Sequence, residues 1–179
     1  LQRLEAEPFL PSTWLRHQSR DAYWRHGSVS EAYAAIKAKV LAVGGWGDAY
    51  KNAVPQILQN LPGAKGIIGP WVHKYPHFAV PEPRIGFLQE ALRWWDHWLR
   101  GIDTGVEGDP DLRVYQMDGV RPATWYADRP GRWLADPQTT PQHFHLSEAG
   151  LSRPDDGRFR KTPNAPQDTG ADAGEDCAL

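Results

Sequence analysis

The sequence has a single cysteine, Cys177, and it has no long hydrophobic run. One thiol excludes a disulfide within the chain. A membrane helix needs about 20 consecutive apolar residues, whereas this chain has a mean hydropathy of −0.61, so we expect no membrane partner. The lack of disulfides is compatible with either side of a membrane, with the cytoplasm slightly favoured.

An excess of charge of one sign is also lacking. The chain has 20 basic and 22 acidic residues among its 179, for a net charge of −2. Proteins that bind nucleic acid do so largely through a basic face, so we expect no nucleic-acid partner.

Patterns that would hold a cofactor or a metal are missing. The glycines at 44–47 do not have the spacing of a dinucleotide-binding loop. His143 and His145 share one face of a predicted strand, but no third zinc ligand follows at a suitable spacing. The acidic groups at 155–156 and 172–176 lack the spacing of a calcium loop. We therefore predict no cofactor and no metal.

Two similar stretches lie between Val40 and His77. In the first, an apolar run is followed by Gly-Gly-Trp-Gly and then Asp48; in the second, an apolar run is followed by Gly-Pro-Trp-Val and then His73. In an open α/β sheet, binding and active sites lie beyond the carboxyl ends of the parallel strands. We therefore expect Asp48 and His73 to lie at the same edge of a sheet.

A carboxylate beside an imidazole supplies two of the three groups of a nucleophile–histidine–acid catalytic triad. In α/β-hydrolases the chain order is nucleophile, acid, histidine, and Asp48 precedes His73. Spacing alone leaves two other interpretations open. Asp48 is also a typical helix N-cap or turn residue, and His73 is also a typical exposed loop histidine.

The chain divides into four predicted regions. Residues 1–38 form short helices interrupted by prolines, typical of a cap. Residues 39–104 follow the order strand, helix, strand, helix, which predicts one edge of a doubly wound α/β sheet. Residues 105–150 contain short alternating strands, beginning at 112–117, that indicate the start of a β-sandwich. Residues 151–179 are polar and are predicted to be a long loop or disordered.

The predicted helix over residues 85–100 has a regular apolar pattern. We expect one stripe of its surface to be apolar, formed by Phe87, Leu88, Leu92, Trp95 and Leu99.

Four stretches of sequence together resemble one family: GGWGD, GPWVH, ALRWWDHWLRG and DLRVYQMDG. They resemble the cocaine esterase-like and X-Pro dipeptidyl-peptidase family of serine hydrolases, which includes α-amino acid ester hydrolases. The resemblance covers about residues 8 to 151. It implies the C-terminal edge of an α/β-hydrolase sheet with a cap remnant, followed by the start of a jelly-roll domain.

The same resemblance implies roles for single residues. Asp48 is the acid and His73 the general base of a catalytic triad. Tyr50 corresponds to an aromatic wall of the acyl pocket. Trp46 and Trp71 flank the two turns, where packing is their first expected role and lining of the substrate pocket their second.

The chain departs from this family in having no G-x-S-x-G nucleophile elbow. Its first residue is Leu1, and we expect it to be a C-terminal portion of a longer serine hydrolase that is inactive alone. The expected partners are a small ester, amide or X-Pro peptide substrate, cleaved through an acyl-enzyme, and the N-terminal part of the protein or another chain. The alternative is a non-catalytic remnant or a β-sandwich binding module.

Overall fold

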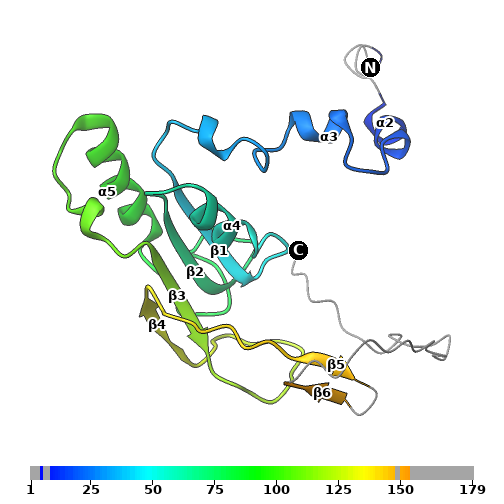
Figure 1. Cartoon of the computed structure of the whole chain (residues 1–179). Coiled ribbons are helices and arrows are strands. Elements are labelled where there is room, and N and C mark those ends of the chain that lie inside the picture. The colour runs from blue at the N-terminus through cyan, green and yellow to red at the C-terminus, as the bar shows by residue number, and fades with distance from the viewer. Residues whose placement is uncertain (1–4, 6–8, 148–149, 154–179) are drawn as a thin grey trace.

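The computed structural model describes residue 5, residues 9–147 and residues 150–153. A four-stranded sheet in the order β1-β2-β3-β4 forms the body, and a two-stranded hairpin follows it (Figure 1). The elements are α2 (Leu10–Arg16), α3 (Ala22–His26), η1 (Tyr33–Ala35), β1 (Leu41–Gly47), α4 (Ala53–Asn60), β2 (Lys65–Val72), α5 (Phe87–Arg100), η2 (Val106–Gly108), β3 (Leu112–Met117), β4 (Gly131–Ala135), β5 (His145–Ser147) and β6 (Gly150–Ser152).

The first two strands form a parallel pair joined through helix α4. Both strands are rich in glycine and aliphatic residues, and six consecutive residues of β2 are buried. Val54 of α4 packs against Ala42 of β1, Ile68 of β2 and Val114 of β3 in one hydrophobic cluster. This is the strand–helix–strand edge that the sequence predicted.

Strand β3 continues the same sheet. Its Leu112 and Val114 pair in parallel with Gly66 and Ile68 of β2, and β4 then pairs antiparallel with β3. The sequence assigned residues 112–117 to a separate β-sandwich because their polar and apolar residues alternate. The jelly-roll domain stays a prediction, because the described strands after β3 are only β4 and the β5–β6 hairpin.

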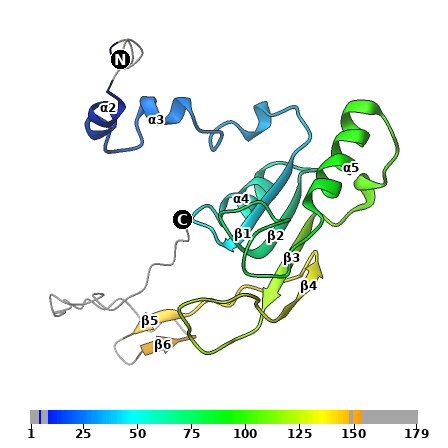
Figure 2. The ribbon, with the colours of Figure 1, turned by 180° about the vertical axis from the view of Figure 1, so that it is seen from behind.

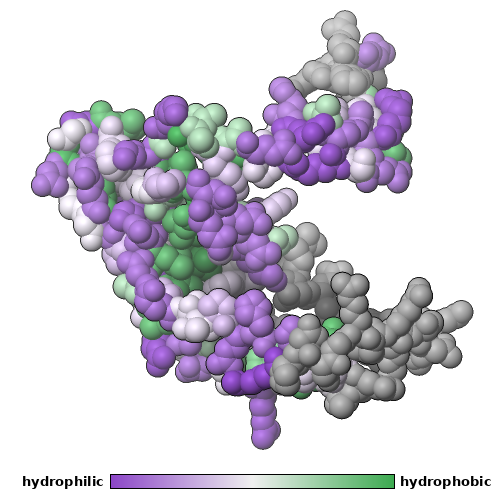
Figure 3. All heavy atoms as spheres, viewed as in Figure 1, coloured by the Kyte–Doolittle hydropathy of each residue, from purple (hydrophilic) through white to green (hydrophobic). Residues whose placement is uncertain are grey.

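Helix α5 buries residues outside most of its predicted apolar stripe. Its buried residues are Ala91 and Trp94, whereas most of the predicted stripe is exposed, with relative exposures of 57% to 78% for Leu88, Leu92, Trp95 and Leu99. Ion pairs hold the opposite face, from Glu90 to Arg113 of β3 at 2.8 Å and from Arg93 to Asp109. Hydrophobic surface also runs along the middle of the body (Figure 3).

The residues before β1 form an arm that carries α2 and α3. The arm stands away from the sheet in both views (Figures 1 and 2). Helix α3 begins at Asp21, whose side chain accepts a hydrogen bond from the backbone of Tyr23 at 3.0 Å, as expected of an N-cap. Among the described residues no helix has the length and apolar content to cross a bilayer.

The pairing of β1 with β2 contains a β-bulge next to the strand ends. Gly45 pairs with Gly69, but Gly47 pairs with Val72, so Pro70 and Trp71 together oppose Trp46. Proline, which lacks a backbone N–H, is tolerated at such a bulge. The bulge brings the carbonyl of Trp71 so close to Gly45 that a Cβ there would lie 2.1 Å from the Trp71 oxygen. Only glycine fits this position without a backbone shift.

We therefore expect Gly45→Ala to destabilise the protein by about 2 kcal/mol, because a backbone carbonyl has to move. The thermal unfolding midpoint, followed by tryptophan fluorescence, measures the effect. Gly27→Ala is the matched control, because Gly27 has a φ of −92° and no heavy atom lies within 4 Å of an added Cβ. Equal midpoints for the two variants would contradict the close approach.

Candidate active site

Asp48 and His73 follow the carboxyl ends of β1 and β2 directly. The structure brings them together, with His73 Nδ1 2.8 Å from Asp48 Oδ2. This is the meeting at one sheet edge that the sequence predicted. Their catalytic roles stay predictions, which the geometry below supports.

Asp48 is held in a tight turn. Its backbone N–H donates to Gly45 at 3.1 Å, and its Oδ1 accepts the backbone N–H of Tyr50 at 2.8 Å. The side chain is only 14% exposed. Burial raises the pKa of Asp48, but the hydrogen bonds from Tyr50 and His73 and the charge of His73 outweigh it, so this pKa lies below its ordinary value. Asp48 is therefore a carboxylate under physiological conditions.

A carboxylate at Asp48 fixes the tautomer of His73. Because Asp48 only accepts hydrogen bonds, Nδ1 of His73 carries the hydrogen. Nε2 of the neutral ring is then a lone-pair acceptor. The His73 side chain is 64% exposed. The ring is thus oriented by its acid and open on its other side, which is the arrangement that a general base needs.

The three aromatic residues predicted near the turns differ in their surroundings. Tyr50 is exposed, and its ring centroid lies 5.9 Å from that of His73. Trp71 is buried and donates its indole N–H to Pro83 at 2.8 Å. Trp46 is half-buried and donates to the backbone of Tyr115 at 2.8 Å. Both tryptophans are thus held by hydrogen bonds to other parts of the backbone, while their role in substrate binding stays a prediction.

A cavity of about 480 Å³ adjoins the pair. It is lined by Asp48, His73, Lys74, Tyr75 and Phe78. None of these lining residues is a serine, threonine or cysteine, and the one hydroxyl group among them is the phenol of Tyr75. The sequence reasoning missed the last three, although their position in the turn after His73 could have indicated them.

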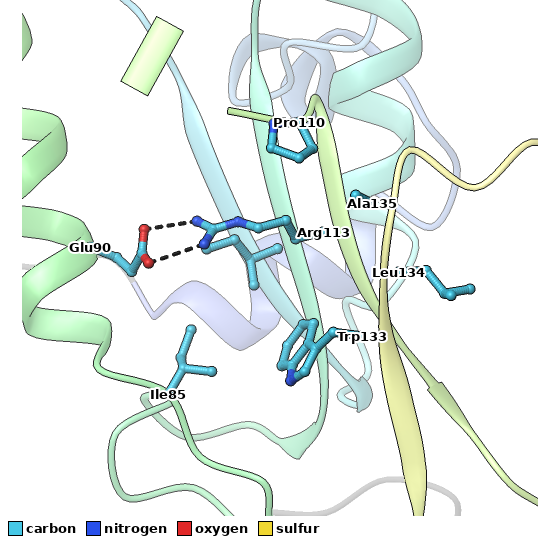
Figure 4. A pocket seen from close by; sticks show the side chains of 8 residues that line it. Ile85, Glu90, Pro110, Arg113, Trp133, Leu134 and Ala135 are labelled. Atoms are coloured by element: carbon cyan, nitrogen blue, oxygen red, sulfur yellow. Dashed lines mark hydrogen bonds and ion pairs between the residues drawn. The ribbon is translucent and has the colours of Figure 1, made fainter. Parts of the chain in front are cut away.

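A second cavity, of about 350 Å³, lies against the sheet between α5 and β4 (Figure 4). Its charged residues, Glu90 and Arg113, pair with each other through two hydrogen bonds of 3.0 and 2.8 Å. Their charges are satisfied within the protein, and none of the residues that line this cavity is a histidine. The chemistry is therefore expected at the first cavity.

Two further histidines make contacts away from Asp48. His97 Nε2 lies 3.0 Å from Glu107 Oε1. His77 is half-buried and packs in an aromatic cluster with Phe78 and Phe87. Within the described residues no group of three His, Cys, Asp or Glu side chains forms a metal site. The acidic groups at 155–156 and 172–176 lie outside those residues.

Comparison with known proteins agrees with this geometry. Two curated relatives, "Putative serine esterase Mb1866c" of Mycobacterium bovis and "Putative serine esterase MT1883" of Mycobacterium tuberculosis, are each 30% identical over 141 residues. The match covers 74% of this chain and 20% of each relative. The chain thus spans about a fifth of the length of these relatives.

A family model also matches the part of the chain that contains both Asp48 and His73. It is described as X-Pro dipeptidyl-peptidase, S15 family, and it matches residues 1–75. The resemblance that the motifs predicted is therefore confirmed: over residues 1–75 this chain is similar to the X-Pro dipeptidyl-peptidase (S15) family.

Proposed function

We propose that the protein containing this chain is a serine hydrolase that cleaves esters or amides, including X-Pro peptides, through an acyl-enzyme. The observation that carries the proposal is the 2.8 Å hydrogen bond between His73 and Asp48 at the ends of two parallel strands. The family match and the two relatives named as serine esterases support the same chemistry.

In the proposed mechanism His73 takes up one proton and releases it again in each half-reaction. Nε2 takes the hydroxyl proton of the nucleophile as its oxygen attacks the carbonyl carbon, and it then gives the proton to the leaving group. In the second half-reaction water replaces the nucleophile and the same proton path repeats. Asp48 holds the ring through Nδ1 and stabilises the imidazolium, and it remains ionised throughout.

The nucleophile and the oxyanion donors are proposed to come from polypeptide outside this chain. The sequence contains no G-x-S-x-G elbow, and the described residues that line the cavity include no serine, threonine or cysteine. Asp48 and His73 are therefore proposed as the acid–base half of a composite site.

The roles of the pair are tested in the complete protein by hydrolysis of p-nitrophenyl esters. His73→Ala removes the general base, and Asp48→Asn allows the wrong tautomer of the ring. We expect kcat to fall about 10⁴-fold in each variant, while labelling of the wild-type serine by a fluorophosphonate probe confirms the nucleophile. His143→Gln is the matched control, because His143 is exposed on the segment before β5. Undiminished turnover in His73→Ala would refute the assignment.

The chain produced alone is expected to have no esterase turnover. An acid and a base without a nucleophile or oxyanion donors leave only residual catalysis. Release of p-nitrophenol by the isolated chain, compared with its His73→Ala variant, measures this. Turnover that disappears in the variant would show that a residue of this chain is the nucleophile.

A further inference from the structure

The turn that follows His73 carries a charged side chain, that of Lys74. The backbone N–H of Lys74 donates to Val72 at 2.7 Å, which fixes the turn, and its side chain lines the cavity with His73. No hydrogen bond or ion pair engages this ammonium group within the described residues. By contrast, the ammonium of Lys65 pairs with Asp111 at 2.9 Å.

The carboxylate in the same cavity is not paired with Lys74. Asp48 uses Oδ2 for His73 and Oδ1 for the backbone of Tyr50. Lys74 is therefore the charged lining residue whose side chain makes no hydrogen bond or ion pair among the described residues. A negatively charged group on a ligand is the natural complement to such an ammonium group.

An exposed aromatic surface lies beside this charge. Tyr75 and Phe78 are 63% and 48% exposed, and their ring centroids are 6.0 Å apart. Tyr75 also stacks on Phe87, the first residue of α5, at 5.9 Å. The helix thus supports the surface, which suits a flat apolar group.

We propose that the cavity selects a substrate that carries a carboxylate next to a flat apolar group. Lys74 pairs with the carboxylate, Tyr75 and Phe78 contact the apolar group, and the scissile bond lies toward Nε2 of His73. Only the position of the scissile bond near Nε2 of His73 rests on the proposed function. Lys74 is a specificity residue here, and it takes no part in the proton transfers.

Binding tests the inference without any turnover. Benzoate and benzamide differ in the carboxylate alone, and their affinities for the complete protein are measured by ligand-observed NMR. We expect benzoate to bind about fivefold more tightly, the upper range for an exposed ion pair, with a preference that weakens as salt is added. Lys74→Met should bring the ratio close to one. Lys37→Met should keep it, because Lys37 is exposed, contacts Ala34 and lies away from the cavity.

Charge reversal gives an independent readout. In Lys74→Glu the preference should change to benzylamine, a flat cation of similar size. An affinity ratio of one in the wild type, or a ratio unchanged in Lys74→Met and Lys74→Glu, would overturn the inference.

Kinetics separates this inference from the proposed function. The kcat/KM for phenyl acetate is compared with that for 4-acetoxybenzoate, whose carboxylate is on the leaving group, and with that for monophenyl succinate, whose carboxylate is on the acyl group. A preference for either charged ester that depends on Lys74 supports the inference and identifies the side that Lys74 contacts. If no ester is cleaved while benzoate binds through Lys74, the proposed function fails and the anion-binding site stands.

Discussion

The parallel pairing of β1 with β2 is the constraint on which the site depends. Before the bulge, paired residues differ by 65 − 41 = 24 positions, and after it by 72 − 47 = 25. Continued by one residue, the second register sets Asp48 opposite His73, which are also 25 apart. Without the extra residue the register would set Asp48 opposite Val72, whose side chain cannot hydrogen-bond. The Gly-Pro-Trp sequence thus has a geometric role, since it contains the residues that shift the register.

The sequence could predict this pairing because each of its signals is local. An apolar run, a glycine-rich turn and one polar residue occur twice, and parallel strands bring their carboxyl ends to the same edge. The face of α5 could not be predicted in this way. Periodicity shows that a stripe is apolar but not which stripe meets the sheet, and here Glu90 and Arg93 pair with Arg113 and Asp109 on the other face. The nearness of Lys74, Tyr75 and Phe78 to His73 could be read from the sequence, but not that their side chains line the cavity, since the directions of side chains in a turn depend on its backbone hydrogen bonds.

The exposed apolar stripe of α5 and the open edge of β1 in the described sheet have the same physical explanation. Leu88, Leu92, Trp95 and Leu99 recur at intervals of four, three and four residues, the spacing with which one helix packs on another. Beside them a groove between α5 and β1 is lined mostly by apolar residues, and β1 pairs with β2 alone in the described sheet. Parallel strands are normally covered on both faces. An exposed stripe next to an open strand edge therefore fits a chain that spans about a fifth of its relatives.

The difference in burial between Asp48 and His73 explains how the pair is organised within this chain. Asp48 is fixed by backbone hydrogen bonds within its own turn, so its position needs no contact from outside the chain. It fixes His73 in turn through Nδ1, and only Nε2 remains to meet a reactant. The orientation of His73 is thus determined by contacts within this chain. In the proposed mechanism, a nucleophile from elsewhere would need only to reach the open side of a ring that is already in the correct tautomer.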